Sequence, residues 1–206
     1  TTVIMPLSTS NGSDGIVLRG KDKTVADLEG KRINLVELSG SHYMLARALQ
    51  TQGLSERDVT VVNTSDADIA SVFESPDTEA VATWKPQLSE ILSQYPDTTL
   101  VFDSSDIYGE LLDTMILRTE ALSDNPDLGR AIAGAWYEAA ALLDPAHPRH
   151  DALMAFTAET LNTDLAGARS QLRTIDFLDA AQAQSLITSD DFVATQKQIT
   201  GFAFEH

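Results

Sequence analysis

Two strand-to-helix junctions follow one another between residues 34 and 68, and they constrain the fold more than any other feature of the chain. In the first, the apolar run 33–37 ends in Ser39, Gly40, Ser41 and His42, where a helical pattern begins. In the second, the run 59–62 ends in polar residues before another helical pattern. Strands that alternate with helices predict a parallel sheet with right-handed crossovers. The carboxyl ends of its strands meet at one edge, where free N–H groups of helix starts can bind a small polar ligand.

The first half of the chain continues this alternation, whereas the second half is helical. Short runs rich in Val and Ile, which suit buried strands, lie at residues 16–19, 80–83 and 99–102. Apolar stripes predict helices after Ser41, with Gly53 at the end, and over residues 68–73 and 87–92. Beyond Asp113 the pattern predicts a strand at 114–117 and helices over 131–142, 152–161, 164–172 and 190–204.

These patterns predict a two-lobed α/β protein. Residues 1–20 and 107–206 are expected to form one lobe, and residues 21–106 a second lobe inserted into it. Gly20 and Gly109 lie near the two crossings, where they serve either as hinges or only as turn residues.

Composition narrows the function. The 206-residue chain carries a formal net charge of −17, which repels nucleic acid, and it has no cysteine for a disulfide, a thiolate metal site or a nucleophile. No apolar run is long enough to span a membrane. Glycine-rich cofactor motifs and a nucleophile elbow are absent, and His147 and His150 lack further metal ligands. We therefore expect no cofactor, no metal and no enzymatic activity.

The first junction supplies the leading candidate ligand residues: Ser39, Gly40, Ser41 and His42. Hydroxyl groups, backbone N–H groups and the positive end of a helix dipole suit an anionic oxygen, and Gly40 permits close backbone approach. The alternative is that Ser39 or Ser41 only caps the helix. His42 either donates a hydrogen bond to the ligand or lies exposed or satisfied in the core.

The second junction also places polar residues between a strand end and a helix start: Thr64, Ser65 and Asp66. Asp66 or Asp68 can hold a cationic or amide end of a ligand, although capping explains the same residues. Trp84 follows a strand and precedes Pro86, so it supplies either an apolar wall of the site or a core contact.

Together with Ala82-Thr83-Trp84-Lys85-Pro86 and Phe102-Asp103-Ser104-Ser105, residues 34–68 resemble the substrate-binding proteins of ABC importers for sulfonates, taurine and nitrate and their urea-carboxylase-associated relatives. The resemblance implies a periplasmic-binding-protein type II-like fold with parallel sheets flanked by helices. It also implies a periplasmic or otherwise extracytoplasmic location and ABC permease subunits as partners. The implied ligand is a small sulfur- or nitrogen-containing solute, such as a sulfonate, taurine, nitrate or a urea- or guanidine-like compound, held between the lobes.

The resemblance brings further residues into consideration. In the family, the polar loop that contains Asn11 and Asp14 faces the ligand cleft; the alternative is a solvated turn. Independently of the resemblance, Glu110 near the second crossing either orders the hinge or meets the ligand, unless it belongs to a solvated acidic face. Lys85 departs from the acidic residue with which taurine-type relatives hold an ammonium group, which argues against taurine itself.

Family members carry a further segment before the position of Thr1, so the first lobe is expected to be incomplete. The chain alone should then bind ligand poorly and self-associate through residues 3–7 and 131–142. Two alternatives share the fold: the effector-binding domain of a LysR-type regulator, which would need a DNA-binding helix-turn-helix, and a pyrimidine-synthase-like enzyme.

Overall fold

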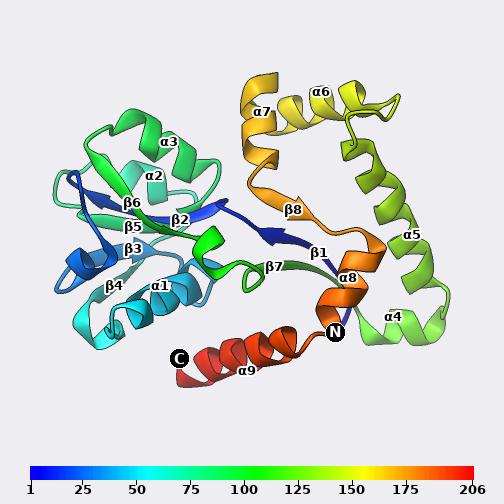
Figure 1. The fold of residues 1–206 in the computed structure, drawn as a ribbon, viewed down its shortest axis with the longest axis horizontal. Helices are drawn as coiled ribbons and strands as arrows, with labels where there is room; N and C mark the ends of the chain where they lie inside the picture. The colour runs from blue at the N-terminus through cyan, green and yellow to red at the C-terminus, as the bar shows by residue number, and fades with distance from the viewer. The chain divides into compact units, whose positions relative to one another are not determined.

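The computed structural model describes residues Thr1 to His206, and the chain divides into two compact units (Figure 1). The first unit comprises Thr1–Thr9 and Leu112–Val193. The second unit comprises Ser10–Leu111 and Ala194–His206, and it contains every candidate ligand residue.

The second unit is built on a five-stranded sheet with the order β4-β3-β5-β2-β6. Its strands are β2 (Asp14–Arg19), β3 (Arg32–Leu35), β4 (Thr60–Asn63), β5 (Ala80–Trp84) and β6 (Thr98–Asp103). β3 pairs in parallel with β4 and β5, and β2 pairs antiparallel with β5 and β6. Four strands therefore run in one direction, as the alternation predicts. The sheet is mixed rather than wholly parallel, because β2 is inserted between β5 and β6.

Helices cover both faces of this sheet (Figure 1). Helix α1 (Gly40–Thr51) packs on one face, and α2 (Ile69–Val72) and α3 (Gln87–Gln94) pack on the other. Side chains that alternate along each strand serve both cores: Ala80 and Ala82 pack with α1, whereas Val81 packs with α2 and α3. Short 3₁₀ turns at Val25–Leu28, Glu56–Asp58 and Ser104–Ile107 connect these elements.

The stripe predicted for α1 is its buried face. Met44, Leu45, Ala48 and Leu49 are all 0% exposed. Burial of a leucine side chain contributes about 1.5–3 kcal/mol, so this face holds α1 firmly on the sheet. Gly53 follows the helix with a φ of +70°, a conformation in which glycine ends helices without steric cost.

The first unit contains a three-stranded sheet with the order β7-β1-β8. Its strands are β1 (Thr2–Ser10), β7 (Leu112–Leu117), antiparallel to β1, and β8 (Ile175–Phe177). Its helices are α4 (Thr119–Asp124), α5 (Leu128–Ala140, followed by a 3₁₀ turn at Ala141–Leu143), α6 (His150–Thr160), α7 (Leu165–Leu172) and α8 (Ala180–Ile187). Trp136 of α5 lies with its ring centroid 6.2 Å from that of Phe177 in β8. Helix α9 (Asp190–Glu205) begins in this unit and continues into the other.

The two units differ from the expected lobes at three places. Residues 10–20, expected in the lobe with the helical tail, belong to the second unit because β2 is an interior strand of its sheet. Ala194–His206 also leave the tail and join the second unit. Residues 107–111, also expected in that lobe, belong to the second unit, so the chain passes between the units at Leu111–Leu112. Gly20 and Gly109 both have positive φ, +97° and +84°, so each serves a turn, and Gly20 lies inside a unit.

Candidate functional site

One edge of the five-stranded sheet collects the candidate residues. The carboxyl ends of β3, β4, β5 and β6 lie there, together with the start of β2, because Asp14 pairs with Trp84 and Gly15 with Asp103. The structure therefore brings together the segments that contain Ser39–His42, Thr64–Asp66, Trp84, and Asn11 with Asp14. Glu110 belongs to the same unit and contacts α1 further along the helix.

The turn before α1 orients the start of that helix. Ser39 is the N-cap: its Oγ accepts from the Ser41 N–H at 3.1 Å and donates to the Val36 carbonyl at 2.6 Å. The first N–H groups of a helix have no partner within it. Ser41 is capped in this way, whereas the N–H groups of Gly40 and His42 have no partner in the protein. Two donors at the positive end of the α1 dipole are thus without a protein partner.

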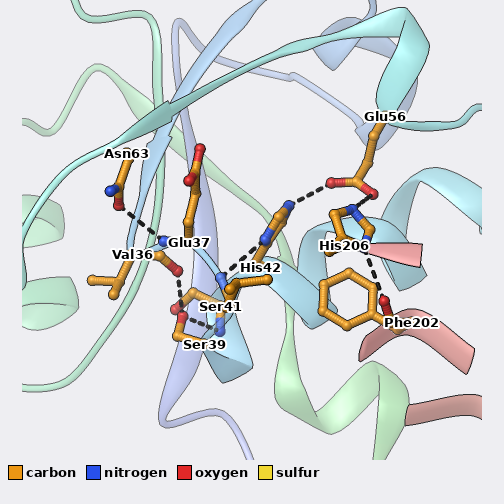
Figure 2. A network of polar contacts seen from close by, with 10 residues as sticks. Val36, Glu37, Ser39, Ser41, His42, Glu56, Asn63, Phe202 and His206 are labelled. Atoms are coloured by element: carbon orange, nitrogen blue, oxygen red, sulfur yellow. Dashed lines mark hydrogen bonds and ion pairs between the residues drawn. The ribbon is translucent and has the colours of Figure 1, made fainter. Parts of the chain in front are cut away.

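Ser41 adds a third donor at this point. The residue is 0% exposed, and its Oγ makes no hydrogen bond. A buried hydroxyl without a partner costs about 1–3 kcal/mol, so this group calls for an explanation such as a water molecule, an ion or a ligand. Figure 2 shows Ser39 and Ser41 side by side at the start of α1. The sequence offers Ser39 and Ser41 alike as caps or ligand residues, whereas in the structure Ser39 caps the helix and the Ser41 hydroxyl has no partner.

His42 is held by protein groups on both sides of its ring (Figure 2). Its Nδ1 accepts from the Leu38 N–H at 3.1 Å, and its Nε2 lies 2.5 Å from Glu56 Oε1. The Phe202 ring packs edge-on at a centroid distance of 5.1 Å. Of the two alternatives for His42, these contacts favour a satisfied histidine that supports the site, rather than a side chain that donates to the ligand.

The polar groups of the second junction also have protein partners. Thr64 Oγ1 accepts from Asn34 Nδ2 at 2.9 Å, and Ser65 Oγ donates at 2.6 Å to the Asp68 carboxylate. Asp66 Oδ1 accepts from Gln87 Nε2 at 3.0 Å, which ties the start of α2 to the start of α3. None of these side chains caps α2, because its N-cap residue Asp68 makes no side-chain hydrogen bond to the helix, so the contacts tie the junction to neighbouring polar groups instead. Gln87 Oε1 is buried without a partner, and no pattern in the sequence selects this residue for the site.

Trp84 and Lys85 continue the edge beyond β5. Trp84 is half-buried at the end of the strand, and the Lys85 N–H donates to the Ser13 carbonyl at 2.9 Å. Burial lowers the pKa of the Lys85 ammonium, and the Asp103 carboxylate opposes this change. The Asp103 carboxylate therefore already provides a negative charge near this partly desolvated cation.

The loop before β2 is held by Ser104, which the sequence marks only as part of the motif Phe102-Asp103-Ser104-Ser105 and not as a site residue. Ser104, which is 0% exposed, lies with its Oγ 2.7 Å from Ser10 Oγ and accepts from the Gly12 N–H at 2.8 Å. Ser10 Oγ in turn donates to Asp14 Oδ2 at 2.5 Å. The signal was present in the sequence, since Ser104 follows a strand end as Ser39 and Ser65 do.

Glu110 anchors the segment before β7 on α1. Its Oε2 accepts from Tyr43 Oη at 2.5 Å and from Arg47 Nε at 2.7 Å, and its Oε1 accepts from Arg47 Nη2 at 2.9 Å. Desolvation raises the pKa of the Glu110 carboxyl, but the hydrogen bonds from Arg47 and Tyr43 outweigh it, and the pKa is lowered overall. Of its two predicted roles, ordering this segment is the one these contacts support.

We expect Glu110→Gln to lower the free energy of unfolding by about 1–2 kcal/mol at pH 7, since it removes a charge-assisted pair that is only partly screened by solvent. A lowered pKa stabilises the fold above the ordinary value of 4.5 and ceases to do so as the pH falls through the folded value. The difference from wild type should therefore narrow at pH 4. Urea unfolding at both pH values measures this, with the exposed Glu29→Gln as control. An equal difference at both pH values would contradict the assigned pair.

The family model described as NMT1/THI5 like matches residues 4–149. The chain belongs to this family. The taurine-binding periplasmic protein of Escherichia coli (strain K12) is 25% identical to this NMT1/THI5-like chain over 134 residues, which are 64% of this chain and 41% of that protein. The chain thus spans less than half the length of the curated relatives it matches, between 23% and 41%.

Solved structures agree on the fold. The periplasmic aliphatic sulphonate binding protein SsuA from Escherichia coli superposes with a TM-score of 0.76 at 21% identity, covering 98% of this chain and 64% of that one. The desulfurization enzyme DSZB superposes with a TM-score of 0.61 at 17% identity, covering 97% of this chain and 71% of that one. The fold therefore occurs in binding proteins and in an enzyme. None of the helices described here has both the length and the apolar character to cross a membrane.

Proposed function

We propose that this NMT1/THI5-like chain belongs to the extracytoplasmic solute-binding component of an ABC importer and that it captures the anionic end of a small sulfur- or nitrogen-containing solute at the start of α1. One observation carries this proposal. The buried Ser41 hydroxyl lacks a partner beside the free N–H groups of Gly40 and His42. Permease subunits at the membrane are the partners that such a component serves.

The donors at this point match an oxyanion in number and in sign. A sulfonate or nitrate presents several acceptor oxygens, and α1 offers two N–H groups, one hydroxyl and a dipole equivalent to about half a positive charge. The Ser39 side chain already satisfies the third N–H, so the helix start is shaped before a ligand arrives. The names of the taurine-binding and aliphatic sulphonate binding relatives support a sulfonate as the anion.

Lys85 refines the choice among sulfonates. Its ammonium is partly desolvated at the same edge, where a second positive charge on the solute would be repelled. We therefore expect ethanesulfonate to bind more tightly than taurine, which differs from it chiefly by an ammonium group. Guanidinium carries no negative charge and should not bind at the start of α1.

Thermal unfolding with each solute in turn tests this ranking, because a ligand that binds only the folded state raises the midpoint by mass action. We expect the midpoint to rise most with ethanesulfonate, less with taurine and nitrate, and not at all with guanidinium at equal ionic strength. Lys85→Ala should narrow the difference between ethanesulfonate and taurine. A rise with guanidinium and none with either sulfonate would contradict an anion site.

The structural similarity to DSZB is not evidence that this chain is an enzyme, because proteins of one fold can have many different functions. Nucleophilic catalysis needs a nucleophile within hydrogen-bond reach of a base. Ser41 Oγ has no such neighbour, and the nearby His42 ring is already bound to Leu38 and Glu56. This arrangement supports binding rather than bond cleavage at the edge.

A further inference from the structure

We infer that Glu56 and His206 are positioning residues for the solute site: through His42 they hold the turn that presents the start of α1. Neither residue lies on the α1 turn itself, and His206 is 150 residues away from Glu56 in the chain. This inference rests on the proposed function, because it concerns how the same donors are held in place.

The first step is the tautomer of His42. The Leu38 N–H can only donate, so the Nδ1 that accepts it at 3.1 Å carries no proton. The proton of the neutral ring therefore lies on Nε2, which donates to Glu56 Oε1 at 2.5 Å. A carboxylate in this place fixes both the tautomer and the orientation of an imidazole. His42 is 4% exposed, so water does not compete for these contacts.

The second step is the strained turn that His42 supports. Leu38 has a φ of +60° and its side chain is 68% exposed, so burial of that side chain does not hold the conformation. Left-handed backbone at a residue other than glycine costs on the order of 1–3 kcal/mol and persists only where surrounding contacts impose it. The Ser39 hydroxyl donates to the Val36 carbonyl at 2.6 Å and the Glu37 N–H donates to Asn63 Oδ1 at 3.1 Å, so both flanks of the turn are held. The bond to His42 is the contact made by the Leu38 N–H itself.

The third step is the contribution of α9. His206 Nδ1 donates to the Phe202 carbonyl at 2.9 Å, and its Nε2 lies 2.7 Å from Glu56 Oε2. The hydrogen bond to Phe202 and the charge of Glu56 raise the pKa of His206, which favours the imidazolium that both contacts require. The last turn of α9 thus closes over His42, with ring centroids 4.9 Å apart, and fixes the second oxygen of Glu56 (Figure 2).

A metal ion is the other occupant that His42, Glu56 and His206 suggest, since their ligand atoms lie within 4.8 Å of one another. Zinc bonds of about 2.0–2.1 Å place tetrahedral ligand atoms roughly 3.3 Å apart. The observed contacts of 2.5 and 2.7 Å are hydrogen-bond distances, and the protonated Nε2 of His42 has no lone pair for a metal. The geometry is that of a positioning network.

Glu56→Ala and Glu56→Gln in the ¹⁵N-labelled chain test the inference, with the exposed neighbour Arg57→Ala as control. Histidine ¹⁵N spectra report the His42 tautomer, amide exchange reports the turn at Leu38, and titration with ethanesulfonate reports the site. In Glu56→Ala we expect loss of the single tautomer, about tenfold faster exchange at Leu38 and about tenfold weaker ethanesulfonate binding. Glu56→Gln keeps an acceptor for His42 and should largely restore the tautomer and the Leu38 protection. His206→Gln should show a smaller loss than Glu56→Ala.

The outcomes separate this inference from the proposed function. If Ser41→Ala loses ethanesulfonate while Glu56→Ala keeps the wild-type tautomer, exchange and affinity, the inference is overturned and the proposed function stands. If no variant changes affinity, the proposed function fails, and the tautomer and exchange data still decide whether Glu56 holds the turn. Stoichiometric binding of added zinc that depends on Glu56 would overturn the inference in favour of a metal site.

Discussion

Replacing Ser41 with alanine is expected to weaken ethanesulfonate binding by about 10- to 100-fold without lowering the free energy of unfolding. A hydrogen bond to a charged group contributes about 1.5–3 kcal/mol, and this one would be lost. The fold loses nothing, because the Ser41 hydroxyl has no partner in the protein. Removal of an unsatisfied buried group should even stabilise the chain slightly. NMR titration gives the affinity even when binding is weak, and urea unfolding gives the stability.

Ser39→Ala is the matched control, and it should show the opposite pattern. Ser39 caps α1, so its loss should cost about 1 kcal/mol of stability, while the affinity changes less than in Ser41→Ala. Equal effects of the two substitutions on both quantities would mean that the two serines share one structural role, and the assignment of Ser41 to the solute would be wrong.

Gly40→Asp is expected to have the largest effect on binding, with up to about a thousandfold loss of affinity for ethanesulfonate. Two like charges about 4 Å apart repel by roughly 1–4 kcal/mol between the dielectric limits of water and a protein surface. The substitution fits sterically, because a Cβ on the exposed Gly40 would lie 3.5 Å from Leu111 Cδ2. The carboxylate should also favour the helix by about 0.3–1 kcal/mol, since it lies at the positive end of the dipole.

Gly40→Asn is the control that distinguishes the effect of the added charge on affinity from the effect of the added side-chain volume. Asparagine has nearly the size of aspartate and no charge, so it should retain most of the affinity. The same NMR titration measures both variants, and the difference should shrink at high salt. Equal losses in the Asp and Asn variants would show that bulk alone matters and that no anion binds beside Gly40.

The elements that the sequence predicts best are those with local signals. The periodic stripe of α1 and the glycine after it depend on residues within a few turns of one another, and the helix lies where they predict it. The placement of β2 has no local signal. Ile16 pairs with Ala82 on one side and with Phe102 on the other, so its position depends on partners distant in sequence. Its inclusion in the second unit could not be derived from periodicity.

In the candidate site, too, some features have a local signal in the sequence and others depend on partners distant in the chain. The hydroxyl residues at each strand end mark the edge in the sequence, but their partners decide what each residue does. Ser39 turns back to Val36 and Ser65 reaches Asp68, whereas Ser41 meets no protein group. The contact by which the end of α9 holds Glu56 could not be predicted from the sequence, because Glu56 and His206 lie 150 residues apart and meet only in the folded chain.

Titration of the ¹⁵N-labelled chain with ethanesulfonate, followed by amide chemical shifts, tests the central claim most directly. If the anion binds at the start of α1, the amide signals of Gly40 and His42 should move furthest, saturate together and share one dissociation constant. These two N–H groups have no partner in the protein and would gain the charged oxygens. Shifts confined to the second junction around Ser65 and Asp66, or the absence of any saturable shift at Gly40 and His42, would contradict the claim.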